Sequence, residues 1–510
     1  MKSLVKTVVL ITGFSVLTRI VGFLFRIYLS RTVGAEALGL YQVAFSVFMV
    51  LLTVVSSGLP FVISRLTARY RVDGNKQSQG KVLSSALIIG LIVSLLLCGV
   101  ILLLRNVFKG LFSDPACIMI LIALLPALVF SAVYSVFRGA LWGQDNYFAL
   151  CVSEFFEQVV RIFLCVLMLA PTASAIANAV NVGWSLTIAC AMSMVFVVLL
   201  YFIYGGKMSK PGKEYKQLLK RSTPITGVRV AGSLAQPLIA LIMPARLIAI
   251  GYSSSQAMSL FGVAVGMSLP LLFIPSTLIG SLATALVPDI SMAVVKDDKV
   301  HIEARIRSAA IFALFVSAMV VPLFMGAGDL IGEFLYGNSL SGIILASSAW
   351  IMIPIGLNNI TSSLLNSLGY EVRSCLNYFV GAIFMFAAMW FLPAICGINA
   401  LFWGMGLCMS VTAVLNFFML KRKTGVKLKI LKPLVLLILI TIPCAALVSF
   451  MAKLCCFVMP LVLAIIISCG MGFIFYVLLC MVFNVVDVKG YFVQVTSKFK
   501  IKGLKKVKKS

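Results

Sequence analysis

Long apolar runs of about twenty residues alternate with short polar segments from end to end of the chain. A helix rises about 1.5 Å per residue, so each run can cross the roughly 30 Å of hydrocarbon in a bilayer. The runs are apolar on every face, whereas the strands of a transmembrane barrel alternate at every second residue. The pattern predicts an all-α polytopic membrane protein of about fourteen helices, at residues 5–30, 39–67, 82–104, 116–141, 147–170, 178–204, 223–250, 256–287, 306–327, 339–366, 374–394, 397–420, 430–452 and 456–484.

Composition agrees with this pattern, because 62% of the residues are hydrophobic and only 11% are charged. A soluble domain carries roughly 25% charged residues and could not hide so much apolar surface. The first run begins like a signal peptide, after Lys2 and Lys6, but it passes Arg19 and Arg26 without a small-residue cleavage site. We therefore expect it to be retained as the first helix.

The positions of lysine and arginine predict the orientation of the helices, because cytoplasmic loops retain positive charge. With the N-terminus inside, 33 of the 42 basic residues fall in inside segments, four in outside loops and five within helices. We expect both termini to be cytoplasmic, in the inner membrane of a bacterium. The net charge of +27 indicates no nucleic-acid partner, since the basic residues lie in short loops without stacking aromatics; the basic tail is expected on membrane lipids.

An internal repeat appears at an offset of 220 residues. It pairs Leu40-Tyr41-Gln42-Val43-Ala44 with Leu260-Phe261-Gly262-Val263-Ala264, and Arg26 with Arg246. Two parallel six-helix repeats related by a pseudo-two-fold axis are typical of transporters that alternate between two states. The predicted parts are an N-lobe (1–206), a basic cytoplasmic linker (207–222), a C-lobe (223–420), two extra C-terminal helices (421–487) and a basic cytoplasmic tail (488–510).

Arg19 and Arg26 lie seven residues apart, within about 20° of one face of the first helix, together with Ser15 and Gly22. An arginine at the bilayer centre costs at least about 2.5 kcal/mol, so this stripe should face the bundle interior. Arginine suits phosphate, because its planar fork binds two oxygens and stays charged when desolvated. The alternatives are snorkelling for Arg26 and, for Arg19, an ion pair with Glu154, Glu157 or Asp289.

Other polar residues in the predicted helices extend this candidate binding site. Helix 7 carries Arg229 and Arg246, and helix 2 presents hydroxyl and amide groups at helical spacing that suit a sugar or act as interhelical hydrogen-bond partners. The proposed substrate-binding set is Arg19, Arg26, Arg246, Arg229, Gln42, Ser46 and Ser57.

Helix 5 carries acids as well as a base. Glu157 and Arg161 are spaced i,i+4, with Glu154 one turn earlier. They form either a structural ion pair, which we favour, or an ion-coupling site. His301 is the only histidine, and most of the thirteen cysteines fall in apolar runs. The chain therefore predicts no metal, no cofactor and no catalytic residues.

Helices 1 and 2 carry Phe25-Arg26-Ile27-Tyr28-Leu29-Ser30-Arg31, Gly39-Leu40-Tyr41-Gln42 and Ser56-Ser57-Gly58-Leu59-Pro60. This stretch resembles the stage V sporulation protein B family, within the multidrug/oligosaccharidyl-lipid/polysaccharide exporters and related to MurJ lipid II flippases. Gly143-Gln144-Asp145 and its expected counterpart Gly369-Tyr370-Glu371 also fit that family.

The resemblance implies a flippase rather than an enzyme, one that carries a lipid-linked pyrophosphate saccharide, above all lipid II, to the outer leaflet by alternating access. It implies that Arg19 and Arg26 contact the pyrophosphate, although MurJ-like proteins space these arginines six apart and this chain spaces them seven apart. It also implies a lipid-tail groove at helices 13 and 14, and cell-wall synthesis machinery as a partner, in vegetative growth or sporulation. The alternatives are a drug/cation antiporter and a non-transporting envelope scaffold.

Overall fold

The computed structural model describes residues 2–170, 172–212, 214–277, 279–280, 299–425 and 431–485, with side chains described from residue 10 and, after the gap, from residue 303. In this part of the chain all regular structure is helical. Twelve helices there are long and apolar enough to cross a membrane. One of them, Leu10–Val72, contains two predicted helices, and Tyr147–Met168 matches a further one, so the predicted all-α polytopic fold of about fourteen helices is confirmed.

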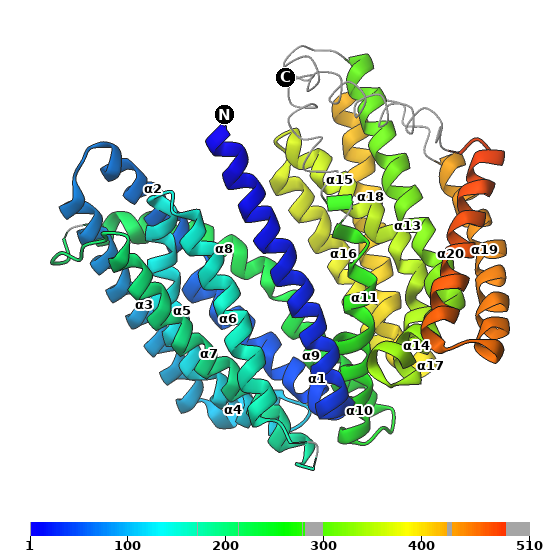
Figure 1. Ribbon diagram of the computed structural model, residues 1–510, viewed down its shortest axis with the longest axis horizontal. Coiled ribbons are helices and arrows are strands. Elements are labelled where there is room, and N and C mark those ends of the chain that lie inside the picture. The colour runs from blue at the N-terminus through cyan, green and yellow to red at the C-terminus, as the bar shows by residue number, and fades with distance from the viewer. Residues whose placement is uncertain are drawn as a thin grey trace, which may run out of the picture. The chain divides into compact units, whose positions relative to one another are not determined.

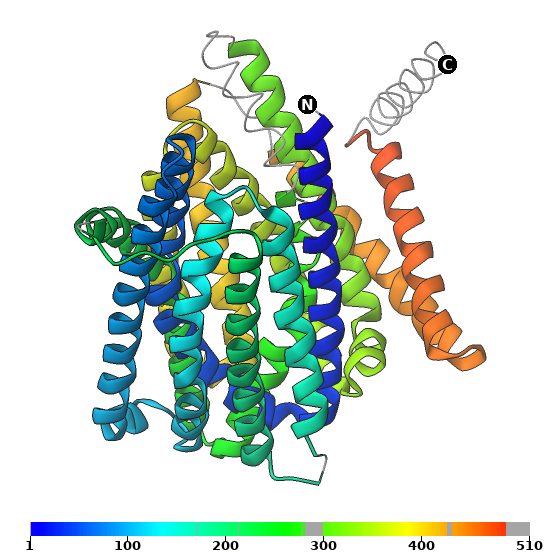
Figure 2. The same ribbon diagram turned by 60° about the vertical axis from the view of Figure 1, so that its left-hand side comes forward.

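The helices form two compact units, Met1–Met267 and Ser268–Ser510, called here the first and the second unit. In the first unit, α5, α6 and α7 run side by side, as both ribbon views show (Figures 1 and 2). The elements of this unit are α1 (Lys2–Ser56), α2 (Leu59–Val72), α3 (Lys76–Leu103), α4 (Arg105–Leu111), α5 (Ala116–Gly143), α6 (Tyr147–Met168), α7 (Ala175–Ile203), α8 (Glu214–Ser233), α9 (Ala235–Ala249), α10 (Ser254–Phe261) and the π-helix η1 (Gly262–Ser268).

The predicted loop between the first two helices is shorter than expected. The two halves of α1 join at Gly34, whose φ of 76° and ψ of 175° lie outside the helical region. Only glycine adopts this conformation readily, so one residue suffices where the sequence pattern predicted a break over 31–38. The second half of α1 then ends at Ser56, and Gly58 separates it from α2.

Close glycine packing holds the second half of α1 against α10. A Cβ atom on Gly39 would overlap the backbone of Met258, and one on Gly262 would overlap the backbone of Ala35. Gly262 also begins the seven-residue π-helix η1 inside predicted helix 8. π-Helical turns inside α-helices are frequent at functional sites.

The second unit is built from α11 (Leu269–Phe273), α13 (Lys299–Tyr336), α14 (Ser339–Ser348), η2 (Ala349–Ile351), α15 (Met352–Ser367), α16 (Glu371–Phe391), α17 (Pro393–Cys396), η3 (Gly397–Asn399), α18 (Ala400–Thr424), α19 (Leu431–Val458) and α20 (Leu461–Val482). The last two helices pack on α13, where the buried Tyr476 hydroxyl donates to the Phe315 carbonyl at 3.0 Å. The glycines of α13 allow its close contact with α14.

The turn between α5 and α6 has the same hydrogen bonds as the turn between α15 and α16, which supports the internal repeat. The Asn146 amide donates to the Leu141 carbonyl, and the Tyr370 amide donates to the Leu365 carbonyl. The left-handed residue before each helix is Asp145 in one turn and Gly369 in the other. The predicted pairing of Gly143-Gln144-Asp145 with Gly369-Tyr370-Glu371 is therefore out of register by two residues, because glycine was aligned with glycine rather than by turn geometry.

Several expectations remain predictions. Asp289 and the tail at 488–510 lie outside the described residues, as does the side chain of His301. The predicted lobe boundaries come from the internal sequence repeat. The division into two compact units does not test them. In the first unit α8, α9 and α10 pack against α1, so this unit includes helices that the repeat assigns to the second half of the chain.

Candidate functional site

The polar stripe of the first helix lies on the first half of α1, as the spacing indicated. Ser15 and Arg19 are exposed, and Gly22 and Arg26 are half-buried. Arg19 makes no ion pair with a carboxylate in the described part of the chain. The stripe is therefore exposed in its first part, at Ser15 and Arg19, and partly covered at Gly22 and Arg26.

The stripe borders the contact between α1 and α6. Phe14 packs edge-on against Phe148 and Phe155, with ring centroids 6.3 and 6.2 Å away. Phe25 lies under the Arg161 guanidinium, 5.5 Å from the ring centroid. This contact positions two polar residues of α6, Gln158 and Arg161, next to Gly22 and Phe25 of α1.

The expected ion pair between Glu157 and Arg161 is wrong. Arg161 instead donates from a terminal nitrogen to the Gln158 side-chain oxygen, three residues away on the same helix. Glu157 forms no ion pair within 4.0 Å in the described structure. The i,i+4 rule gives proximity on a helix surface, but the Arg161 side chain turns to Gln158 of the same helix instead of to Glu157.

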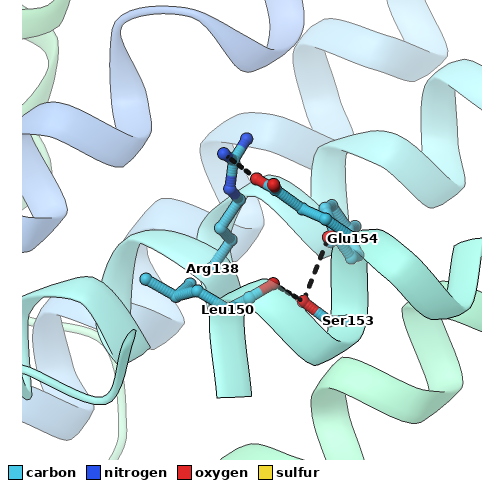
Figure 3. Close-up of polar contacts among 5 residues, drawn as sticks. Arg138, Leu150, Ser153 and Glu154 are labelled. Carbon is cyan, nitrogen blue, oxygen red and sulfur yellow. Dashed lines mark hydrogen bonds and ion pairs between the residues drawn. The ribbon is translucent and has the colours of Figure 1, made fainter. Parts of the chain in front are cut away.

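Glu154 is paired with Arg138 of α5, which excludes it as the structural partner of Arg19 (Figure 3). Both side chains of this pair are about half exposed, at 47% and 44%. Beneath the pair, Ser153 donates to the Leu150 carbonyl at 2.8 Å and lies 3.2 Å from the Tyr134 hydroxyl. The contacts join α5 to α6 near the start of α6.

The two arginines predicted on helix 7, Arg229 and Arg246, lie in different environments. Arg229 on α8 is exposed, and its guanidinium lies 4.5 Å from the centroid of the Phe61 ring on α2. Phe61 in turn packs edge-on against Trp142 of α5. Arg246 is half-buried in the last turn of α9, where a positive charge is favoured by the helix dipole.

The hydroxyl groups predicted to line the site bond mostly to their own helix. Ser46 donates to the Val43 carbonyl at 2.7 Å, while Gln42 is half-buried. Ser57 is different, because its buried hydroxyl at the break between α1 and α2 has no hydrogen-bond partner among the described residues. Helix packing therefore accounts for Ser46, whereas the described structure gives the Ser57 hydroxyl no acceptor.

Gln158 is a polar residue of this region that sequence reasoning missed. It is 8% exposed, and its amide nitrogen has no hydrogen-bond partner in the described part of the protein. Its helical spacing was visible in the sequence, since Gln158 lies one turn from both Glu154 and Arg161. The prediction for this helix rested on the charged residues and left the neutral amide out.

A second missed feature is a chain of buried amides in the second unit. Asn377 on α16 donates to Asn416 on α18, and Asn416 donates to Ser362 on α15, at 2.8 and 2.9 Å. Ser362 then donates to the Asn358 side-chain oxygen at 3.3 Å. The network joins three helices and is internally satisfied, which indicates a structural role.

Two cavities at helix ends are lined by none of the stripe residues. One of about 450 Å³ in the first unit is lined by Arg71 and Asp145, which form an ion pair of 2.8 Å. One of about 520 Å³ in the second unit is lined by Arg373, Arg422 and Lys423. Among the described residues no group of three or more potential metal ligands is present.

Comparisons with known proteins identify what the fold is similar to. Residues 4–294 match the family model described as polysaccharide biosynthesis protein. The chain is 28% identical to stage V sporulation protein B of Bacillus subtilis (strain 168) over 399 residues, covering 74% of this chain and 75% of that protein. It is 20% identical to lipid II flippase MurJ of the same organism over 463 residues, covering 83% and 84%.

Solved structures show the same fold. The lipid II flippase MurJ in an inward closed conformation superposes with a TM-score of 0.66, covering 93% of this chain and 98% of that one at 15% identity. A multidrug resistance MATE family transporter of the MOP superfamily, inward-facing, gives 0.65 at 16% identity, covering 80% and 94%. At these identities the likeness establishes the fold alone.

Proposed function

Since this chain belongs to the polysaccharide biosynthesis protein family, we propose that it is a flippase for an undecaprenyl-pyrophosphate-linked saccharide, lipid II above all. It moves this lipid from the inner to the outer leaflet of the bacterial inner membrane by alternating access, with both termini in the cytoplasm. The product feeds synthesis of peptidoglycan or another envelope glycan, including the spore cortex.

The observation that carries this proposal is the stripe of Arg19 and Arg26 on an open face of α1. Two permanent positive charges on one face of a membrane helix are costly unless they serve a ligand or a partner. Arg19 has no carboxylate partner in the described structure, and Glu154 pairs with Arg138. A pyrophosphate supplies two adjacent anionic groups to such a face.

The relatives support the same substrate class, because one is named for flipping lipid II and another for stage V sporulation. They also support a transporter over an enzyme. Membrane lipids and the cell-wall synthesis machinery are the proposed partners.

A second candidate, a drug/cation antiporter, is favoured by one observation. Glu157 lies within α6 of the first unit and forms no ion pair there, so its carboxylate is available to a proton or a cation. Such a site would also serve a flippase coupled to an ion gradient. The transport that Glu157→Gln impairs separates these roles: loss of ion-driven drug efflux identifies an antiporter, and loss of lipid II translocation identifies an ion-coupled flippase.

Complementation of a flippase-depleted bacterium tests the proposed function. The wild-type chain should restore growth and move lipid II to the outer leaflet, measured with a probe that reacts only with outer-leaflet lipid II. Arg19→Ala and Arg26→Ala should fail, and Arg246→Ala should fail if it acts as the repeat partner of Arg26. Arg105→Ala, an exposed arginine on the short helix α4, is the matched control and should complement fully.

Two outcomes contradict the proposal. If the wild-type chain reaches the membrane of the depleted strain and leaves lipid II in the inner leaflet, lipid II is not its substrate. If both α1 variants move lipid II at the wild-type rate, the stripe does not bind the pyrophosphate. Immunoblots of membrane fractions establish that each variant reaches the membrane in the amount of the wild type, and size-exclusion chromatography in detergent establishes that it is folded.

A further inference from the structure

A cavity of the second unit, called here the basic pocket, lies where α16 begins and α18 ends. Its volume is about 520 Å³, and its lining residues are Tyr370, Arg373, Asn377, Phe418, Met419, Arg422 and Lys423. Pockets that bind small ligands measure about 300–1,000 Å³, so the basic pocket has the size of a ligand site. Three of its lining side chains are cations, and none of the described residues that line it is acidic.

The cations of the basic pocket lack carboxylate partners. Arg373, Arg422 and Lys423 form no ion pair with a described residue. Glu371 is the acid closest to Arg373 in sequence, but it is exposed, does not line the pocket and is in no ion pair within the described structure. Three like charges around one cavity repel one another, so an anion bound between them relieves that repulsion as well as forming contacts.

The equivalent turn of the first unit carries an acid that the basic pocket lacks. There Asp145 occupies the left-handed position before α6 and pairs with Arg71 at 2.8 Å on the wall of a cavity. In the second unit Gly369 takes that position, in a turn closed by the same hydrogen bond. The carboxylate of the first turn therefore has no counterpart in the basic pocket, whose cations remain available to an external anion.

Two contacts hold the polar groups of the basic pocket in place. The Lys423 ammonium lies 5.1 Å from the centroid of the Tyr370 ring, and Asn377 donates to Asn416 of α18 at 2.8 Å. A cation that an aromatic ring already holds loses less freedom when a ligand binds. The ring face that Lys423 covers is also closed to a quaternary ammonium group. The basic pocket therefore favours an anionic ligand over a choline headgroup.

An exposed apolar stripe on α18, called here the α18 stripe, leads to the basic pocket. It consists of Trp403, Leu407, Val414 and Phe418, which helical spacing places on one face of α18. Phe418 also lines the pocket, one turn before Arg422. Because α18 belongs to a helix long and apolar enough to cross a membrane, acyl chains can lie along the α18 stripe while a headgroup enters the pocket. A soluble anion would make no use of this stripe.

We propose that the basic pocket binds the phosphodiester group of an anionic glycerophospholipid such as phosphatidylglycerol. Arg373 and Arg422 donate to the phosphate oxygens, Lys423 adds a third positive charge, and the acyl chains follow the α18 stripe. Basic pockets between helices bind anionic headgroups on the cytoplasmic side of a membrane, which is the side that the lysine and arginine pattern predicts for the end of α18. The pocket shares no residue with the stripe of α1, and its ligand does not depend on the proposed function.

Binding of lipids with different headgroups tests the proposal. Purified protein in detergent is titrated with phosphatidylglycerol, phosphatidylcholine of the same acyl chains, farnesyl diphosphate or glycerol phosphate, and the thermal midpoint is recorded at each concentration. We expect phosphatidylglycerol to bind roughly tenfold more tightly than phosphatidylcholine, and the double variant Arg373→Gln/Arg422→Gln to bind both about equally. Arg69→Gln/Lys421→Gln is the matched control, because it removes the same charge from exposed residues outside the pocket, and it should keep the preference.

Gly369→Asp gives the second turn the carboxylate of the first turn. A Cβ atom at Gly369 meets nothing within 4 Å, so the side chain has room. The new carboxylate should pair with the pocket cations and lower the affinity for phosphatidylglycerol roughly fivefold. Gly369→Asn is the matched control, because asparagine has the same shape, tolerates the left-handed conformation equally and carries no charge; it should bind as the wild type does.

The proposal is overturned if Arg373→Gln/Arg422→Gln keeps the wild-type preference, or if Gly369→Asp and Gly369→Asn bind phosphatidylglycerol equally well. A midpoint that rises with glycerol phosphate as much as with phosphatidylglycerol overturns the lipid and identifies a free phosphate ester as the ligand. Tighter binding of farnesyl diphosphate that is lost in the double variant overturns the phospholipid and assigns the pocket to a lipid diphosphate. Size-exclusion chromatography before each titration establishes that the variants are folded.

Discussion

Gly39 and Gly262 allow α1 and α10 to approach closely, and Gly39→Ala should therefore destabilise the first unit. A Cβ atom on Gly39 would lie 2.7 Å from the carbonyl carbon of Met258. Ordinary contact between carbon atoms is about 3.7 Å, so the helices must separate by about 1 Å. The obstacle is backbone, which cannot rotate away as a side chain could.

The size of the effect follows from this separation. A gap of about 1 Å forfeits up to half of the dispersion energy of the contacts it opens, and forced overpacking typically costs about 1–3 kcal/mol. At roughly 2–4 °C for each kcal/mol in a unit of this size, the midpoint of thermal unfolding should fall by about 2–12 °C.

The measurement compares Gly39→Ala with Gly99→Ala in α3, where an added Cβ meets nothing within 4 Å. Replacing a glycine inside an exposed helix surface by alanine is stabilising by about 0.5–1 kcal/mol, so the two substitutions should shift the midpoint in opposite directions. Each purified variant is heated in detergent, and its folded fraction at each temperature is measured by size-exclusion chromatography. The two unfolding midpoints are then compared. An unchanged or raised midpoint in Gly39→Ala would refute the close crossing.

Two further predictions concern local interactions. The half-exposed pair of Arg138 and Glu154 should contribute at most about 1 kcal/mol, so a double-mutant cycle with Arg138→Gln and Glu154→Gln should give a coupling below that value; a coupling of several kcal/mol would show that solvent does not screen the pair. Gly369→Ala should lower stability by about 1–2 kcal/mol, because φ at this residue is 80°, whereas Gly369→Asp should lower it less, since Asp145 occupies the equivalent position at φ 58°. Equal losses in the two variants, measured by thermal unfolding, would contradict the turn equivalence.

Helix positions were accessible from sequence because the membrane imposes a length on each apolar run and permits little else. The chain accordingly has helices close to the predicted spans, from α3 (Lys76–Leu103) to α20 (Leu461–Val482). Irregularities within helices were not accessible. The reversal at Gly34 and the π-helix at Gly262 depend on one glycine each, and many of the 38 glycines look alike in sequence.

In the candidate site, too, features that follow from helical periodicity were predictable from sequence, and features that depend on side-chain packing were not. The common face of Arg19 and Arg26 follows from helical periodicity and is independent of tertiary contacts. Glu154 pairs with Arg138 of a neighbouring helix and Arg161 with Gln158 of its own helix, so the sequence suggested a pair of Glu157 and Arg161 that the structure lacks. Gln158 gains its importance from Gly22 on another helix segment, a contact that no spacing rule could reveal.

Lipid II transport by the purified protein in liposomes tests the central claim most directly. The fraction of lipid II that reacts with an impermeant probe is followed over time after reconstitution in one leaflet. The wild type should accelerate the exchange, Arg26→Gln should slow it at least tenfold, and Arg105→Gln should match the wild type. Exchange by the wild type no faster than in protein-free liposomes, or by Arg26→Gln as fast as by the wild type, would contradict the account.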